Sequence, residues 1–331
     1  MDEAARIERI LAAARAGGAE TEGPEVVLGP GDDAALLLPP PGCELVWTTD
    51  EQLEDAHFRR SWTEWAGFAA LGRKAAGASL SDLAAMGARP LGALLSLRAP
   101  RELAPEALAE VARGIGEQLG PAACPLVGGN LARDPARLGI SVEVLGAVER
   151  GRALRRDAGR AGDRLFVSGP LGWARLALLW LEEQPRPAAE LARELADGPW
   201  ARALAALLRP RPRLELGRVL AGRGERIAAM DLSDGLARDL PRLALASGLA
   251  AEVTRARLPG PDPALCAALG RSPADLAWEG GEDYELLVAG PAELAEVDGL
   301  TEIGHLVAGE PGRVSLDGTP VTLAGFDHFA D

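Results

Sequence analysis

Acidic residues within one strand-like stretch near the N-terminus most strongly constrain what this chain can fold into. The stretch runs from Leu28 to Phe58 and reads LGPGDDAALLLPPPGCELVWTTDEQLEDAHF. Two β-type runs, residues 34–38 and 44–49, flank a Pro-Pro-Pro-Gly breaker, which predicts an antiparallel pair. That hairpin would bring Asp33 and Asp50 to the same end. Carboxylates gathered in this way repel one another unless a cation lies between them. The stretch also carries Asp32, Glu51, Glu54 and Asp55.

Further aspartates fall where predicted elements end, beside small residues. Asp82 lies in LSDLAAMGARP, and Asp231 and Asp234 lie in DLSDG. Ligands are often presented from such element ends, and carboxylate oxygens suit Mg²⁺. An acidic pocket binds a polyphosphate such as ATP only through bridging cations, so we predict a Mg²⁺-dependent, phosphate-handling protein. Glycine-rich turns at residues 128–129 and 169–172 would let backbone N–H groups approach phosphates.

Each of these motifs also has an ordinary structural explanation. Asp32-Asp33 alone reads as a turn, and an aspartate at a helix start, as expected for Asp82 and Asp234, caps backbone N–H groups. His57 alone is as compatible with a structural role as with a functional one. The segment GPGDDA matches the loose dinucleotide pattern G-x-G-x-x-[GA], but carboxylates would lie where a pyrophosphate must go and a strand follows in place of a helix. The accumulation of aspartates at element ends favours the cation site.

The length of 331 residues predicts two domains. Arginines and glycines cluster near residues 149–162, so we place the boundary there and expect domains at 1–150 and 151–331. Hydrophobic periodicity predicts helices at 62–87, 100–120 and 187–208. It predicts strands at 91–97, 125–127, 139–148, 164–168, 227–230 and 251–254.

The net charge of −14 argues against nucleic acid as a partner, because an acidic surface repels a polyanion. Lys74 is the only lysine, and no G-x-x-x-x-G-K-[ST] phosphate loop occurs. The three widely separated cysteines suit free thiols in a reducing cytosol better than disulfides or a zinc site. The N-terminus lacks the basic start of a secretion signal, and no apolar run reaches membrane-spanning length. We therefore expect a cytoplasmic protein that does not bind membranes.

Together, the motifs resemble those of the thiamine-monophosphate kinases, in the superfamily that includes aminoimidazole ribonucleotide synthetase. The matching stretches occur in family order from Gly29 to Phe329. They are GPGDDAALL, TTDEQLEDAHF, LSDLAAMGARP, LVGGN, GRALRRDAGRAGD, RPRPRLELG, DLSDGLARDL, GGEDYELL and GFDHF.

The resemblance implies roles for particular residues. Metal ligation falls to Asp33, Thr48, Thr49, Asp50, Asp82, Asn130, Asp231 and Asp234. ATP binding falls to Gly129, Asn130, Arg156 and Ser233, and thiamine monophosphate binding to His57, Glu282 and Phe326. The implied reaction transfers the γ-phosphoryl group of ATP directly to thiamine monophosphate. Because the acceptor is an anionic phosphate oxygen, no general base is expected, and positioning with charge neutralisation by several Mg²⁺ ions is sufficient.

The resemblance also implies an α/β (α+β) fold and a homodimer. The N-terminal β-sheet domain would bind ATP and Mg²⁺ and pair with its copy to complete a β-barrel. The C-terminal domain would be α/β.

Two departures from the family pattern concern function. The family's G-G-D-T-T is here Gly128-Gly129-Asn130-Leu131-Ala132, so an amide replaces a metal-binding carboxylate and two hydroxyls are lost. Asp134 is close enough in sequence to substitute. Asp55 replaces a usual glycine, and its charge beside His57 could disfavour an anionic substrate. These departures leave open two alternatives: a catalytically impaired nucleotide-binding homologue, and a superfamily sister acting on another small substrate.

Overall fold

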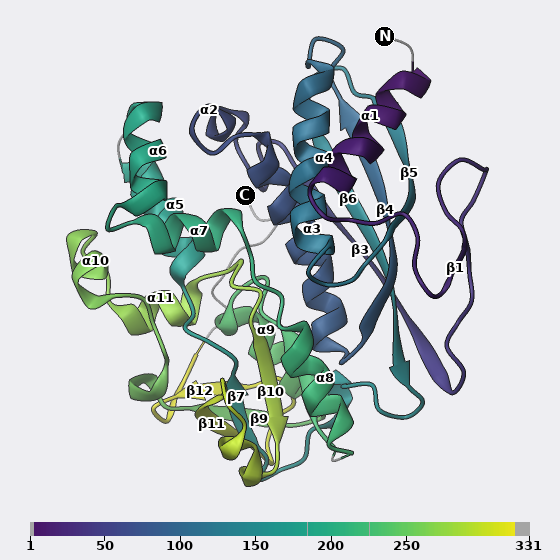
Figure 1. Cartoon of the computed structure of the whole chain (residues 1–331). Coiled ribbons are helices and arrows are strands. Elements are labelled where there is room, and N and C mark those ends of the chain that lie inside the picture. The colour runs from purple at the N-terminus through teal and green to yellow at the C-terminus, as the bar shows by residue number, and fades with distance from the viewer. Residues whose placement is uncertain (1–2, 184, 225, 322–331) are drawn as a thin grey trace. The chain divides into compact units, whose positions relative to one another are not determined.

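The computed structural model describes residues 3–183, 185–224 and 226–321. The chain forms two compact units, which can be followed by colour along the chain in Figure 1. One unit consists of Met1–Leu83, Ala88–Gly151 and Ala188–Arg193, and the other of Ala84–Gly87, Arg152–Pro187 and Glu194–Asp331. Within the described ranges, no helix combines the length and the apolar character needed to cross a membrane.

The first unit is built on a four-stranded sheet in the order β3-β6-β4-β5. Its strands are β3 (Cys43–Leu53), β4 (Arg89–Ala99), β5 (Leu126–Arg133) and β6 (Gly139–Glu149). β6 pairs antiparallel with both β3 and β4, whereas β4 and β5 run parallel. A parallel pair needs a crossover, which helix α4 (Pro105–Leu119) supplies between β4 and β5.

The predicted hairpin between residues 34–38 and 44–49 is wrong. β2 (Leu36–Leu37) pairs with the preceding strand β1 (Val26–Leu28), and β3 pairs with β6 along its whole length, from Cys43 to Leu53. β3 is 11 residues long, and β6 is a partner of equal length, which the short apolar run before the prolines cannot match. The expected pairing of Asp33 with Asp50 at one hairpin end therefore does not form.

The sheet of the first unit is open in the single chain. β3 and β5 are its edges, and no further strand of the described residues pairs with either one. A closed barrel is therefore absent from this part of the single chain, and the fold is a mixed α/β arrangement of sheets and helices.

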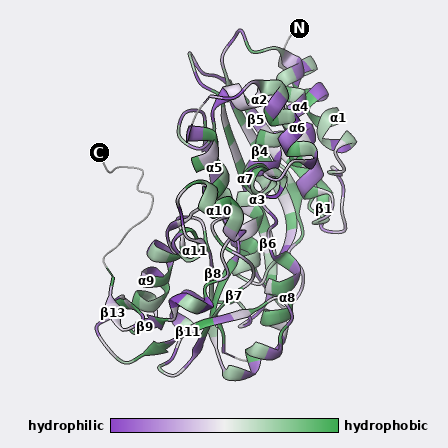
Figure 2. Cartoon of the chain, turned by 90° about the vertical axis from the view of Figure 1, so that its left-hand side faces the viewer, coloured by the Kyte–Doolittle hydropathy of each residue, from purple (hydrophilic) through white to green (hydrophobic). Residues whose placement is uncertain are grey.

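Helices α1 (Glu3–Ala16), α3 (Phe68–Ala85) and α4 approach one another backbone to backbone. A Cβ atom added at Gly72 of α3 would lie 2.0 Å from the carbonyl oxygen of Val111 in α4. One added at Gly116 of α4 would lie 2.0 Å from the carbonyl oxygen of Ala14 in α1. Glycine is required at both positions for this packing. Figure 2 shows hydrophobic and hydrophilic residues on both α1 and α4, as amphipathic helices require. A short helix, α2 (Thr63–Ala66), precedes α3.

The second unit contains a seven-stranded sheet in the order β13-β12-β9-β11-β7-β10-β8. Its strands are β7 (Arg164–Val167), β8 (Ala228–Asp231), β9 (Ala250–Val253), β10 (Leu286–Gly290), β11 (Thr301–Val307), β12 (Val314–Leu316) and β13 (Thr319–Pro320). All neighbouring pairs are antiparallel except β9 and β12. The sheet is thus mainly antiparallel and mixed.

The helices of this part of the chain follow the apolar periodicity of the sequence. They are α5 (Trp173–Glu183), α6 (Ala188–Asp197), α7 (Ala201–Leu208), α8 (Leu214–Gly222), α9 (Leu236–Ala246), α10 (Pro263–Ala268) and α11 (Pro273–Glu279). The helical region expected at 187–208 is divided into α6 and α7. Gly198 is extended, with ψ of 168°, because the proline that follows disfavours a helical conformation at the preceding residue.

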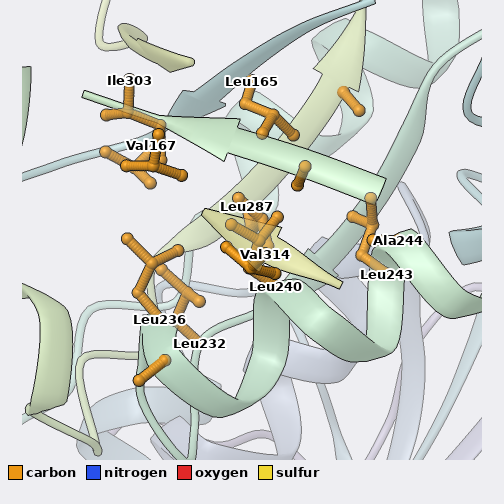
Figure 3. Packing of buried hydrophobic residues seen from close by; sticks show 14 of the residues in the cluster. Leu165, Val167, Leu232, Leu236, Leu240, Leu243, Ala244, Leu287, Ile303 and Val314 are labelled. Atoms are coloured by element: carbon orange, nitrogen blue, oxygen red, sulfur yellow. The ribbon is translucent and has the colours of Figure 1, made fainter. Parts of the chain in front are cut away.

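The core of the second unit forms where α9 packs on the sheet. Leu236, Leu240 and Leu243 lie on one face of α9 and are completely buried. Figure 3 shows their side chains turned toward the strand residues Val167 and Leu287. Because α9 begins directly after the DLSDG segment, this packing fixes the position of Asp231 and Asp234.

Candidate active site

Thr48 and Asp50 lie on the helix-covered face of the first unit's sheet. Residues of β3 alternate between faces, and the strand partners of Thr48 and Asp50 on β6 are the buried residues Val144 and Val142. The Thr48 hydroxyl donates a hydrogen bond of 2.5 Å to Oδ2 of Asp82 on α3. The structure therefore brings Thr48, Asp50 and Asp82 together on one face.

This cluster has excess negative charge. The pKa of Asp50 is raised to about 7, first because the carboxyl group is buried and second because the Asp82 carboxylate is near. Asp82 lies in the last turn of α3, so the expected helix-start cap is wrong for this residue. The negative end of the helix dipole further disfavours a carboxylate there. Two carboxylates beside a hydroxyl form an oxygen-rich set that suits a hard cation such as Mg²⁺.

Thr49 and Asn130 lie on the opposite, open face of the same sheet. Thr49 pairs with Glu143 on β6, and Asn130 pairs with Ser96 on β4, whose neighbour on β6 is Ser141. Directly opposed residues point to the same side of a sheet. The side chains of Thr49 and Asn130 are therefore separated by the sheet from that of Asp50.

A hollow of about 940 Å³ lies within the first unit, between α1, residues 30–37 and the sheet. Its lining is mainly apolar and includes Ile7, Leu11 and Trp47. The polar residues that line it include Asp32, Asp33, Ser96 and Asn130. Asp33 thus shares this hollow with Asn130, and the predicted metal ligands of the first unit fall into two groups.

Two glycines of the predicted phosphate-binding turns, Gly129 and Gly172, already have structural roles in strand packing and hydrogen bonding. Gly129 lies inside β5, which continues to Arg133, so no turn forms there. A Cβ atom at Gly129 would lie 2.0 Å from the Leu95 carbonyl oxygen, which explains the glycine by strand packing. Gly172 donates its N–H to both carboxylate oxygens of Asp283, at 2.8 and 2.9 Å. The N–H of Gly172 is therefore already used inside the protein.

His57 lies in a loop that follows β3 and is anchored by buried groups. Its Nδ1 accepts the N–H of Leu53 at 3.1 Å, so the neutral ring carries its proton on Nε2. Buried Glu54 accepts the N–H of Leu138 at 2.9 Å and pairs with Arg60 at 2.9 Å. These contacts hold the imidazole in one orientation.

Asp55 fits its loop despite replacing a glycine. Its φ of 68° lies in the left-handed region, which explains the usual glycine, and aspartate tolerates this region better than most residues. Arg137 lies 3.6 Å from the Asp55 carboxylate and offsets part of its charge. The predicted repulsion of an anionic substrate is thereby weakened.

In the second unit, Asp231 ends β8 and Asp234 precedes α9. Asp234 does not cap α9 with its own side chain, contrary to the expected capping role. Instead, Oδ2 of Asp239 accepts the N–H groups of Asp234 and Gly235 at 3.0 and 3.1 Å. Arg242 binds both carboxylates, with 2.6 Å to Asp234 and 2.8 Å to Asp239.

The segment that carries Glu282 is joined to the segment that carries Asp231, Ser233 and Asp234. The N–H of Glu282 donates to the Ser233 carbonyl oxygen at 2.7 Å, and the N–H of Tyr284 donates to that of Leu232 at 2.9 Å. Glu282 and Tyr284 both have positive φ values, 63° and 51°. The structure thus places the predicted substrate residue Glu282 beside the predicted nucleotide residue Ser233.

Several residues that support these segments were missed in the sequence. Asp283 accepts the N–H groups that begin α5, and burial raises its pKa well above its usual range. Glu285 is buried, pairs with Arg213 and accepts the Ser168 hydroxyl at 2.5 Å. The signal that could have identified two of them is a charge beside an apolar run, at 239 before LPRLALA and at 285 before LLVAG, since buried charges need partners.

Two further residues with predicted ligand-binding roles are Arg156 and Phe326. Arg156 begins a short 3₁₀ helix and is exposed, and Phe326 lies outside the described residues. Nowhere in the described ranges do three or more histidine, cysteine, aspartate or glutamate side chains form a cluster that could hold a metal. All three cysteines are free thiols, and Cys124 and Cys266 are buried.

Comparisons with known proteins agree along nearly the whole chain. The family model "AIR synthase related protein, N-terminal domain" matches residues 31–148, and the corresponding C-terminal domain matches residues 160–317. The thiamine-monophosphate kinase of Synechococcus elongatus is 37% identical over 78% of this chain and 76% of its own. That of Aquifex aeolicus is 35% identical over 90% and 92%, and that of Escherichia coli K12 is 34% identical over 92% and 93%.

Solved structures give the same result. A structure described as AaThiL complexed with AMPPCP and TMP superimposes with a TM-score of 0.77 and 33% identity, covering 88% of this chain and 89% of its own. The thiamine-monophosphate kinase of Stenotrophomonas maltophilia gives 0.75 and 35%, covering 97% and 98%. The hydrogenase maturation protein HypE gives 0.71 at 20% identity, which shows a shared fold alone. This chain therefore belongs to the AIR synthase-related family and, within it, to the thiamine-monophosphate kinases.

Proposed function

We propose that this chain transfers the γ-phosphoryl group of ATP to thiamine monophosphate, giving thiamine diphosphate and ADP. The observation that carries the proposal is the 32–37% identity to thiamine-monophosphate kinases over 78–92% of the chain. The AMPPCP and TMP in the structural relative AaThiL support a nucleotide and thiamine monophosphate as the ligands here. The reaction moves the phosphoryl group to a phosphate oxygen that is already anionic, so no side chain needs to remove a proton.

We propose that the oxygen ligands of both units hold Mg²⁺. In the first unit these are Asp50 and Asp82 with the Thr48 hydroxyl, and in the second they are Asp231 and Asp234. The raised pKa of Asp50 supports this, because a bound cation would remove the repulsion between Asp50 and Asp82. When bound, Mg²⁺ would neutralise charge on the transferred phosphoryl group. Asp33 and Thr49, which lie apart from Asp50, would serve other ions than the one at Asp50.

The chain's own residues would position the substrates. The hollow of the first unit, with Gly129 and Asn130 on its lining, is the proposed place for part of ATP. Ser233 and Arg156 are also proposed to bind ATP, as the family resemblance implies. His57 and Glu282 are the proposed contacts of thiamine monophosphate, as the family resemblance implies. Phe326 remains a proposed substrate contact on the strength of the family resemblance.

Asn130 motivates the alternative of a nucleotide-binding homologue with impaired turnover. A substitute role for Asp134 is disfavoured, because its Oδ1 already accepts the N–H groups of Ala136 and Arg137 at 2.9 and 2.8 Å. At ~3.3 Å per strand residue, Asp134 is also about 13 Å along the chain from Asn130. A large gain in activity of N130D would favour the impaired homologue, whereas little change would mean that the amide suffices.

We further propose that residues 1–150 form the ATP-binding, Mg²⁺-binding and dimerisation domain, and residues 151–331 the α/β domain. Exposed apolar side chains of the first unit support a homodimer: Leu36 and Leu38 near β2, and Leu45 and Trp47 on β3, are 52–72% exposed. Apolar patches of this kind mark interaction surfaces. Pairing across this face with a second copy would complete the β-barrel that the single chain lacks.

The test of the reaction is chromatographic detection of thiamine diphosphate after incubation with ATP, Mg²⁺ and thiamine monophosphate. An identical incubation with EDTA is the control for the cation. Metal-dependent product supports the proposal. Absence of product, with ATP binding still detected by calorimetry, would instead support the impaired homologue. Turnover only with a different small acceptor would support a superfamily sister.

A further inference from the structure

Arg242 of α9 connects two carboxylates with one nitrogen atom. Its Nη1 donates to Oδ2 of Asp234 at 2.6 Å and to Oδ1 of Asp239 at 2.8 Å. Asp239 is completely buried, whereas the Arg242 side chain is 46% exposed. The three residues therefore form a network in which one half-exposed cation lies between two more buried acids.

The two carboxylates differ in their hydrogen-bond partners. Asp239 holds the start of α9 through the N–H groups of Asp234 and Gly235, and this role does not require Arg242 to contact Asp234. The Asp234 carboxylate is 23% exposed, and the guanidinium is the partner of its Oδ2. A divalent cation bound to the same carboxylate would lie within a few ångströms of the guanidinium, and like charges at such a distance repel strongly.

We propose that Arg242 is an internal counter-cation that competes with a divalent cation for Asp234. It neutralises Asp234 in the cation-free protein and must release this carboxylate when the cation binds. Arg242 thereby sets the cation affinity of the second unit. The inference rests on the proposed role of Asp234 as a cation ligand and deepens it. The long, half-exposed side chain can move into solvent, whereas Asp234 is held by its backbone bond to Asp239.

The experiment measures Mn²⁺ binding to the EDTA-treated full chain by electron paramagnetic resonance. Arg242→Gln removes the competing charge and keeps a hydrogen-bonding side chain, so we expect about threefold or more tighter binding at one site. Arg242→Lys retains the charge and should bind like wild type. Arg255→Gln is the matched control, because Arg255 also pairs with a half-exposed carboxylate of the second unit, that of Asp275. It should leave Mn²⁺ binding unchanged.

The variant Asp234→Asn separates this inference from the proposed function. Asp234→Asn should weaken Mn²⁺ binding, and adding Arg242→Gln to it should then give no gain. Unchanged or weaker binding by Arg242→Gln, or a gain that persists without the Asp234 carboxylate, overturns the counter-cation role alone. Unchanged binding by Asp234→Asn overturns the cation role of Asp234 and the inference with it. Thermal unfolding without Mn²⁺ establishes that each variant is folded.

Discussion

Asp50 is the residue at which the folded structure and the proposed cation binding oppose each other most directly. Its pKa is raised from 3.8 to about 7 by burial and by the charge of Asp82. Between these pH values the folded chain keeps a proton that the unfolded chain has lost. The free energy of unfolding of the cation-free protein therefore falls as pH rises from about 4 to about 7, and the full penalty remains above pH 7.

Replacing Asp50 with asparagine should remove this penalty and also the proposed cation ligand. In EDTA at pH 8 we expect D50N to be more stable than wild type by up to about 4 kcal/mol, with the difference vanishing near pH 4. Urea unfolding at both pH values measures it. Mg²⁺-dependent turnover should be lost although the fold is intact. Unchanged steady-state kinetics of D50N would refute the cation role of this residue.

Asp283 is expected to affect substrate binding only through its neighbour Glu282, a proposed contact of thiamine monophosphate. Its carboxylate accepts the N–H groups of Gly172 and Trp173 at the start of α5, which fixes the chain immediately after Glu282. In D283A these N–H groups lose their acceptor, so we expect the free energy of unfolding to fall by about 1–3 kcal/mol. The KM for thiamine monophosphate should rise more than that for ATP, and D283N should restore part of both losses. Equal changes in both KM values would indicate a purely structural role.

At the scale of elements, backbone hydrogen bonds connect residues 231–235 with residues 280–285 and form a joint between the two segments. This joint contains the candidate residues Asp231, Ser233, Asp234 and Glu282. Gly235 has φ of 101°, and a Cβ atom there would lie 2.6 Å from the Gly280 carbonyl oxygen. Gly248, which follows α9, also has a positive φ, 69°, but an added Cβ atom meets nothing within 4 Å. Both glycines have a positive φ, but Gly235 also has ψ of 154°, a combination that is almost restricted to glycine, and only Gly235 has the clash.

We expect G235A to lose clearly more stability than G248A, whose cost should be only about 1 kcal/mol from the left-handed backbone. The clash should also separate Glu282 from Ser233 and lower the rate of thiamine diphosphate formation by tenfold or more, ~1.4 kcal/mol in activation free energy. Thermal unfolding and initial rates of both variants measure this. If G248A is as damaging as G235A, the joint has no special role.

The elements of the first unit show which parts of the fold the sequence could predict and which it could not. Local signals were sufficient for β6, expected at 139–148 and found at Gly139–Glu149, and for α4, expected within 100–120 and found at Pro105–Leu119. The partner of the strand at 44–49 was not predictable in this way, because β3 and β6 are separated by more than 80 residues and strand pairing depends on tertiary packing.

The candidate site was predictable in its residues and less so in its geometry. Asp50 and Asp82 were both identified from motifs, but their meeting depends on which side of α3 faces the sheet. The separation of Thr48 from Thr49 follows from strand alternation once β3 is known to extend through both. The supporting residues Asp239, Asp283 and Glu285 escaped notice because their contacts are with backbone groups or residues distant in sequence.

At the scale of the whole molecule, part of the open face of the first unit's sheet is an apolar surface that stays exposed within the described part of the single chain. Trp47 on the edge strand β3 is 72% exposed, and Leu45 beside it on the same face is 52% exposed. An uncovered edge strand with large apolar side chains invites pairing with another chain. A second copy of this chain is the occupant that would also close the sheet into the proposed barrel.

Trp47→Glu should therefore convert a dimer into a monomer, because a desolvated carboxylate at the interface costs several kcal/mol. Light scattering coupled to size-exclusion chromatography measures the mass of both states. Leu245→Glu is the matched control: Leu245 is 61% exposed but lies on α9 of the second unit, so its replacement should leave the mass unchanged. A wild-type monomer, or a Trp47→Glu variant that remains dimeric, would refute this interface. If the hollow that we propose for ATP is completed by the second copy, the monomeric variant should also bind ATP more weakly, since Trp47 lines that hollow.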